Sequence, residues 1–142
     1  MTPTETEIKS LLDTWSAAVA AKDVDGLMSL YAPDIVYFDV VPPLQFAGTE
    51  AVRKNFQRWF DIWASGIKSE SRDLRIVTGG DAAIAFKLHR ASGTRKDGRE
   101  VAMWVRVTVA CRRANGRWLI THEHVSLPVE MPAGRALMDL TP

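Results

Sequence analysis

The sequence lacks the features that mark several classes of protein. Its 142 residues include one cysteine, so no intramolecular disulfide can form, and no His/Cys cluster with zinc-ligand spacing surrounds Cys111. Cys111 lies in an alternating apolar run, which predicts a packed thiol rather than a nucleophile. No run of about 18 apolar residues occurs, and the N-terminus lacks the basic and apolar segments of a signal peptide. We therefore expect a cytoplasmic protein with no membrane partner.

An excess of positive charge is also missing. The chain has 18 basic and 17 acidic residues, which give a formal net charge of +1. The densest basic stretches, residues 95–99 and 112–117, each contain a turn signal and predict solvated hairpin ends. We therefore expect no nucleic-acid partner.

Apolar residues recur every three or four positions in three segments, which predicts three helices. The first begins near Thr4, with Glu7 completing a possible capping box. The second begins at Asp23 as N-cap and is stopped by Pro33. The third spans residues 48–66 and carries a wide aromatic stripe.

The remaining pattern predicts strands. Residues 35–41 are rich in β-branched and aromatic side chains, and their alternation places Ile35, Tyr37 and Asp39 on one face. After the third helix, turn signals separate three or four strands, at about 70–78, 82–92, 100–112 and 117–127. Helices followed by an antiparallel meander predict a single α+β domain over residues 1–142. Residues 128–142 predict an irregular tail that covers a pocket mouth, crosses a dimer interface or is mobile.

Three segments together resemble a known family. They are Leu30-Tyr-Ala-Pro-Asp-Ile-Val-Tyr-Phe-Asp, Phe46-Ala-Gly-Thr-Glu-Ala-Val, and the ending Asn115-Gly-Arg-Trp-Leu-Ile-Thr-His-Glu-His-Val-Ser-Leu-Pro. The chain resembles the SnoaL-like and ketosteroid-isomerase-like branch of the nuclear-transport-factor-2-like (NTF2-like) superfamily. This resemblance implies a cystatin-like cone in which three N-terminal helices pack on a strongly curved mixed or antiparallel sheet that encloses a pocket. The fold hosts isomerases, cyclases, dehydratases, epoxide hydrolases and binding-only members.

The resemblance implies that Asp39 is a proton-shuttling base, because it matches the catalytic carboxylate of the steroid isomerases. A carboxylate that faces an apolar cavity is suited to moving a proton next to a carbonyl. Those enzymes complete the site with a tyrosine and a protonated aspartate. The matching positions here carry Trp15 and Thr108, which can each donate one hydrogen bond. Alternatively, Asp39 is a residue at the end of its strand that is solvated or bonded to the turn near Pro42.

The orientation of the last two strands is left open by their alternation. His122 and His124 share a face with Trp118, Ile120 and Ser126. The polar face of the preceding strand carries Trp104, Arg106, Thr108 and Ala110. The opposite face is continuously apolar and carries Met103, Val105, Val107, Val109 and Cys111. The resemblance favours the polar set inside the cone, where Asp39, Arg106 and the two histidines would converge. The apolar set would then face outward and predict a homodimer through the outer sheet face.

Several roles remain open for these residues. The histidines can be acid–base or hydrogen-bonding groups, structural residues or metal ligands; we predict no metal. Arg106 can pair with Asp39 or bind a substrate carboxylate. The Arg106-x-Thr108 pair also resembles part of the epoxide-hydrolase branch, with threonine in place of an acid. Aromatic residues predict an apolar pocket wall or a filled core.

We therefore expect a cofactor-independent acid–base enzyme, an isomerase, cyclase or dehydratase, that acts on a small apolar molecule. A non-catalytic ligand-binding or dimerisation domain is the alternative, and an epoxide hydrolase is a weaker one. The predicted catalytic residues are Asp39, His122 and His124. The predicted substrate-binding residues are Trp15, Tyr37, Phe56, Trp59, Trp63, Trp104, Arg106 and Thr108. His89, Arg90 and Glu123 are assigned no chemistry.

Overall fold

The structure is a computed structural model that describes all 142 residues. Two helices come first, α1 (Pro3–Ala20) and α2 (Val24–Met28), and a third, α3 (Thr49–Ile62), follows two strands. Thr2 rather than Thr4 caps α1 and forms a capping box with Glu5. Asp23 caps α2 as predicted, but α2 ends at Met28, and Pro33 lies in the following strand rather than stopping the helix.

Six strands form one sheet in the order β2-β1-β6-β5-β4-β3. Their bounds are Tyr31–Phe38 for β1, Phe46–Ala47 for β2, Lys68–Gly79 for β3, Ala82–Thr94 for β4, Glu100–Ala114 for β5 and Arg117–Ser126 for β6. The β1–β6 pair is parallel and the other pairs are antiparallel, so the sheet is mixed. The predicted α+β arrangement is confirmed.

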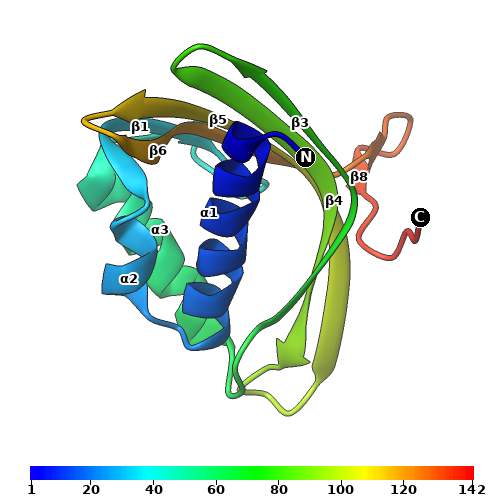
Figure 1. The fold of residues 1–142 in the computed structure, drawn as a ribbon. Coiled ribbons are helices and arrows are strands. Elements are labelled where there is room, and N and C mark those ends of the chain that lie inside the picture. The colour runs from blue at the N-terminus through cyan, green and yellow to red at the C-terminus, as the bar shows by residue number, and fades with distance from the viewer.

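The sheet curves around the helices (Figure 1). In that view, β3, β4 and β5 bend around α1, while α3 lies beside β1 at the other side of the concave face. Buried apolar residues from α1, α3 and the concave face form one core cluster. No helix is both long and apolar enough to cross a bilayer.

A β-bulge decides which side chains of β6 face the helices. Cys111 of β5 pairs with Ile120, but its neighbour Ala110 pairs with His122, so Thr121 is an extra residue in β6. Ile120 is fully buried, and after the extra residue Glu123 takes the next buried position. His122 and His124 consequently lie on the convex side, although simple alternation places them with Ile120.

The apolar face of β5 also points inward. Val105, Val107 and Val109 are buried, whereas Arg106 and Thr108 between them are exposed. The predicted inward orientation of the polar face is therefore wrong. The physical reason is that a sheet face covered by helices loses its contact with water, which favours burial of an uninterrupted valine row over that of an arginine.

The C-terminal tail is partly ordered. Strands β7 (Val129–Glu130) and β8 (Arg135–Ala136) form a small hairpin, so the tail is less irregular than predicted. Ala136 and Met138 line the pocket described below. Of the three roles considered for the tail, the structure thus favours covering the pocket.

Candidate functional site

A pocket of about 400 Å³ lies between α1, α3 and the concave face of the sheet. Twenty of its 27 lining residues are hydrophobic, so most of a bound molecule would contact apolar surface. The aromatic side chains come from α1, β1 and α3 and include Trp15, Tyr37, Phe56, Trp59 and Trp63. The volume is in the range that accommodates a small organic ligand.

Glu123 is the most deeply buried carboxyl group of the pocket, with 3% of its surface exposed. The Tyr31 hydroxyl donates to Glu123 Oε1 at 2.7 Å and accepts from Trp15 Nε1 at 2.8 Å. Burial raises the pKa of Glu123 to about 7, although hydrogen bonds from Tyr31 and Tyr37 favour the ionised form. A substantial fraction of Glu123 is therefore a neutral acid near neutral pH.

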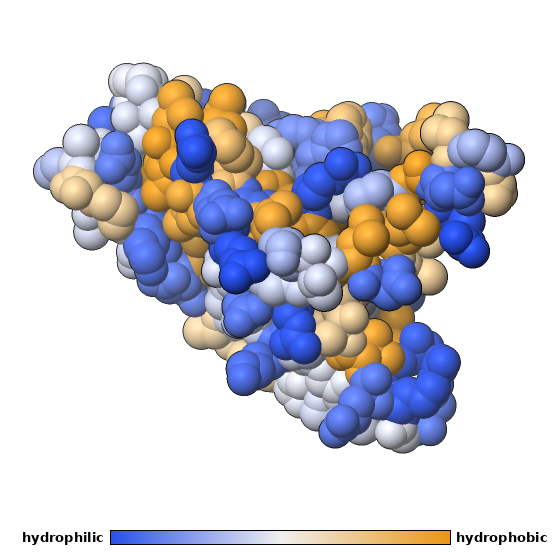
Figure 2. All heavy atoms as spheres, turned by 90° about the vertical axis from the view of Figure 1, so that its right-hand side faces the viewer, coloured by the Kyte–Doolittle hydropathy of each residue, from blue (hydrophilic) through white to orange (hydrophobic).

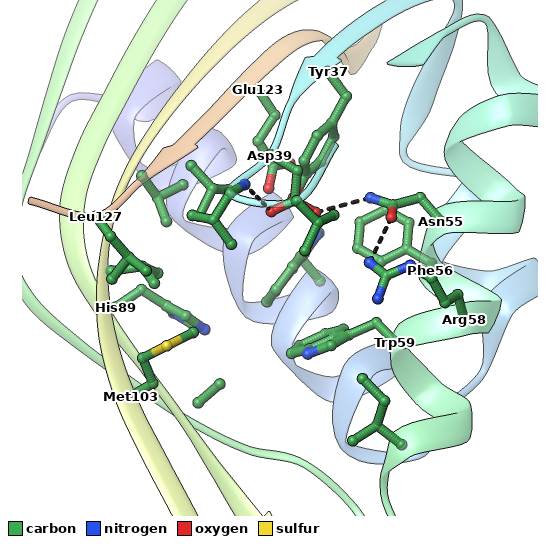
Figure 3. Close-up of a pocket in the computed structure, with 18 of the residues that line it drawn as sticks. Tyr37, Asp39, Asn55, Phe56, Arg58, Trp59, His89, Met103, Glu123 and Leu127 are labelled. Carbon is green, nitrogen blue, oxygen red and sulfur yellow. Dashed lines mark hydrogen bonds between the residues drawn. The ribbon is translucent and has the colours of Figure 1, made fainter. Parts of the chain in front are cut away.

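Asp39 follows the end of β1 and lies beside Glu123 and Tyr37 in the pocket (Figure 3). Its Oδ2 accepts from Asn55 Nδ2 at 2.8 Å, and its Oδ1 accepts from the backbone N–H of Val40 at 2.7 Å. Asn55 is buried on α3, and its Oδ1 accepts in turn from Arg58 at 2.7 Å. These bonds fix both carboxylate oxygens of Asp39 while the residue remains half-buried. Asp39 is therefore not purely solvated: it accepts one bond from the segment that follows its strand, as the alternative allowed, and a second from Asn55 of α3.

Two basic side chains of β4 face the same pocket. Lys87 Nζ donates to Ser71 Oγ at 3.1 Å, and burial lowers the Lys87 pKa while the charge of Glu123 opposes that shift. His89 is 4% exposed. Burial, followed by the charge of Lys87, lowers the His89 pKa to about 4, so its imidazole is neutral at neutral pH.

The structure divides the predicted site residues into two groups. The pocket brings together Trp15, Tyr37, Asp39, Phe56, Trp59 and Trp63. The convex face holds Trp104, Arg106, Thr108, His122 and His124, none of which lines the pocket. Their predicted placement around a substrate in the cone is therefore wrong.

On the convex face these residues make other contacts. Arg106 Nε donates to Ser126 Oγ at 3.0 Å, rather than pairing with Asp39. His122 Nδ1 lies 2.7 Å from the carbonyl oxygen of Val36, and the ring of Phe38 packs against both histidine rings. No group of three His, Cys, Asp or Glu side chains is arranged to hold a metal ion. Neither the epoxide-hydrolase-like pair nor the histidine pair reaches the pocket.

Sequence reasoning missed six polar groups that line the pocket: Asn55, Arg58, Lys87, His89, Arg95 and Glu123. Alternation shows correctly that Glu123 lies on the opposite side of β6 from the two histidines. It does not show that the side with Glu123 is the one that faces the helices. On β4 the hydrophobic pattern is misleading. The apolar residues Ile84 and Phe86 are exposed, whereas Lys87 and His89 on the opposite face are buried. Asn55 has no signal beyond its place on the aromatic side of α3.

Comparisons with known proteins agree with this architecture. The family model for the SnoaL-like domain matches residues 8–130. An NTF2-like protein of unknown function from Pseudomonas putida KT2440 is 34% identical, with a TM-score of 0.90 over 100% of this chain and 99% of that chain. No functionally curated protein matches the chain.

More distant solved structures share the fold. A ketosteroid isomerase-like protein from Erwinia carotovora atroseptica is 16% identical, with a TM-score of 0.76 over 89% of this chain and 97% of that chain. A putative dehydratase of the NTF2-like family from Streptomyces avermitilis is 18% identical, with a TM-score of 0.73 over 85% of this chain and 94% of that chain. Because the family model matches most of its length and the Pseudomonas putida relative is 34% identical, the chain belongs to the SnoaL-like domain family within the NTF2-like superfamily.

Proposed function

We propose that the protein is an acid–base enzyme that needs no organic cofactor and acts on a small, largely apolar carbonyl compound. The observation that carries this proposal is the pair of carboxyl groups, Asp39 and Glu123, that face one apolar pocket in different environments. Carboxyl groups with different environments can divide the roles of base and acid between them. The isomerase-like and dehydratase-like neighbours support this class of reaction.

In the proposed reaction, the Asp39 carboxylate removes a proton from the carbon next to the substrate carbonyl. The C–H bond breaks, an O–H bond forms on Asp39, and the electron pair moves onto the carbonyl oxygen to give an enolate. Protonated Glu123 donates a hydrogen bond to that oxygen, which stabilises the charge in a site of low polarity. In an isomerisation, Asp39 then returns the proton to another carbon. In an elimination, the enolate re-forms the carbonyl and the bond to the leaving group breaks, and the leaving group takes the proton from Asp39.

The fixed position of Asp39 supports its role as the base. The bonds from Asn55 and from the Val40 backbone hold the carboxylate without neutralising it by a direct ion pair. Arg58 holds Asn55 rather than Asp39 itself. Held in this way, the carboxylate has a fixed direction toward the pocket, which positions it for proton transfer.

The proposal is tested without knowledge of the natural substrate by exchange of carbon-bound protons. 1-Tetralone, a two-ring ketone, is incubated with the protein in D2O, and loss of the proton signal next to the carbonyl is followed by NMR. We expect the protein to accelerate exchange, and Asp39→Asn to reduce that acceleration by about 100-fold or more. Glu123→Gln should reduce it by a smaller factor, since an amide is a weaker donor.

His124→Asn is the matched control, because His124 lies on the convex face and should leave exchange unchanged. Ligand binding by wild type and Asp39→Asn is measured in parallel by thermal shift. Saturable binding with no exchange would instead favour a binding-only protein. The absence of both binding and exchange would favour a purely structural domain.

We also propose that a second copy of the chain covers the convex face. The apolar face of β5 lies inside the molecule and cannot form this contact, so other residues would form it. Val77, Ile84 and Phe86 are exposed on β3 and β4. On the side of the molecule drawn in Figure 2, hydrophobic residues form separate patches among hydrophilic ones, a mixture that is common in protein–protein interfaces.

A further inference from the structure

The pocket contains a polar side chain for which the proposed reaction has no use. His89 is buried on β4, lines the pocket, and has no protein hydrogen-bond partner at either ring nitrogen. Its ring instead packs edge-on against Trp15 at 5.5 Å between centroids. A buried polar group without a partner destabilises the folded state, so a folded protein rarely keeps one without a reason.

The other unpaired polar atoms point to the same cavity. The buried side-chain atoms without a partner are Nε1 of Trp63, Oγ of Ser69, both ring nitrogens of His89 and Nε of Arg95. Trp63, His89 and Arg95 line the pocket, and Ser69 does not. The unsatisfied hydrogen-bonding capacity of the protein is therefore concentrated at the surface that a ligand would contact.

His89 lies away from the two carboxyl groups. It pairs with Val105 of β5, whereas Glu123 of β6 pairs with Val109, four residues further along the same strand. Four residues of a strand span about 13 Å. Figure 3 shows His89 beside Met103, across the cavity from Asn55 and Arg58. A group bound by His89 and a group bound by Asp39 or Glu123 would thus belong to opposite ends of one ligand.

We propose that His89 is a substrate-binding residue that hydrogen-bonds a hydroxyl or carbonyl group at the far end of an elongated, two-ended apolar substrate. The inference rests on the proposed function for the carboxyl end and adds the specificity for the other end. A neutral imidazole offers one donor and one acceptor nitrogen, so it can bind either a hydroxyl or a carbonyl oxygen. Because the low His89 pKa keeps the ring uncharged at neutral pH, His89 binds its partner by hydrogen bonding and adds no charge of its own to the pocket.

The site also explains why the ligand should be rigid and flat. Trp15 and Trp59 contribute large aromatic surfaces to the pocket, and Val105 and Val107 line the sheet side between the two polar ends. An aromatic or fused-ring skeleton fills such a space with little loss of conformational entropy. The inferred substrate class is thus a ring compound with one polar group at each end.

The test uses three probes with one skeleton: biphenyl, 4-hydroxybiphenyl and 4,4′-dihydroxybiphenyl. Binding is measured by quenching of tryptophan fluorescence, since three tryptophans line the pocket. The measured quantity is the gain in affinity from the second hydroxyl group, after the statistical advantage of a symmetric ligand is removed. We expect a gain of about threefold to tenfold in the wild type, as one net hydrogen bond gives.

His89→Phe should reduce this gain to about one, because phenylalanine keeps the ring contact with Trp15 and removes both nitrogens. His89→Leu is a second variant with the same expected loss, and Met103→Leu is the control that alters the same end of the pocket and should keep the gain. A gain that survives in His89→Phe, or that is missing in the wild type, would overturn the inference. Because the readout is binding, its failure is distinguishable from a failure of 1-tetralone exchange, which tests the carboxyl end alone.

Discussion

The buried carboxyl group of Glu123 should make the protein less stable as the pH rises, and Glu123→Gln should remove that dependence. Burial raises the Glu123 pKa from 4.5 to about 7. Between these two values the folded state binds more protons than the unfolded state, so the free energy of unfolding falls with increasing pH. The difference of roughly 2.5 pKa units corresponds to about 3 kcal/mol.

The measurement is urea unfolding of both proteins at a series of pH values and one protein concentration. The quantity of interest is the free energy of unfolding of Glu123→Gln minus that of the wild type. This difference should be constant below about pH 4.5, rise by about 3 kcal/mol up to about pH 7, and become constant again above it. His89 contributes the opposite trend, because its lowered pKa makes stability rise from about pH 4 to about 6.5, but this contribution is common to both proteins and cancels in the difference.

Glu100→Gln, at an exposed position on β5, is the matched control for the exchange of a carboxyl group for an amide. Its difference from the wild type should show no such rise. If the Glu123→Gln difference is equally flat, Glu123 is not buried in the way the structure describes. The assignment of Glu123 as the neutral acid of the site would then be wrong.

Three further expectations concern the rest of the molecule. Gly93→Ala should lower the free energy of unfolding in urea by about 1–3 kcal/mol, because its methyl group would lie 2.7 Å from Ser65 Oγ and 3.0 Å from the Trp63 ring. Gly79→Ala is the control and should be near neutral, because a methyl group there would have no atom within 4 Å. Removal of residues 137–142 should speed dissociation of 4-hydroxybiphenyl in stopped-flow fluorescence, since Met138 covers part of the pocket; an unchanged rate would show that the tail is no cover. Phe86→Glu should convert the proposed dimer into a monomer in light scattering, and a wild type that is already monomeric would refute the convex-face interface.

Much of the fold follows from local signals in the sequence. Apolar spacing identifies the three helices, and the turn signals after the third helix separate the long strands correctly. The position of Asp39 beside Tyr37 also followed from alternation along β1. These features depend on residues that are close in the chain, so the sequence is sufficient to predict them.

The composition of the site depended on which sheet face meets the helices. Alternation predicts that Val105 and Val107 lie opposite Arg106 and Thr108, but it is the same for either orientation. The extra residue Thr121 then reverses the alternation within β6, and no residue in the sequence announces a bulge there.

The sequence by itself determined the family, the order of the long helices and strands, and the place of Asp39 on the same face as Tyr37. Only the tertiary structure decided that Glu123, Lys87 and His89 are inside and that His122 and His124 are outside. The physical reason is that burial of a polar group is a property of its surroundings. Tyr31 satisfies Glu123 from 92 positions away, and Trp15, distant in sequence, covers His89, so neither environment can be read from neighbouring residues.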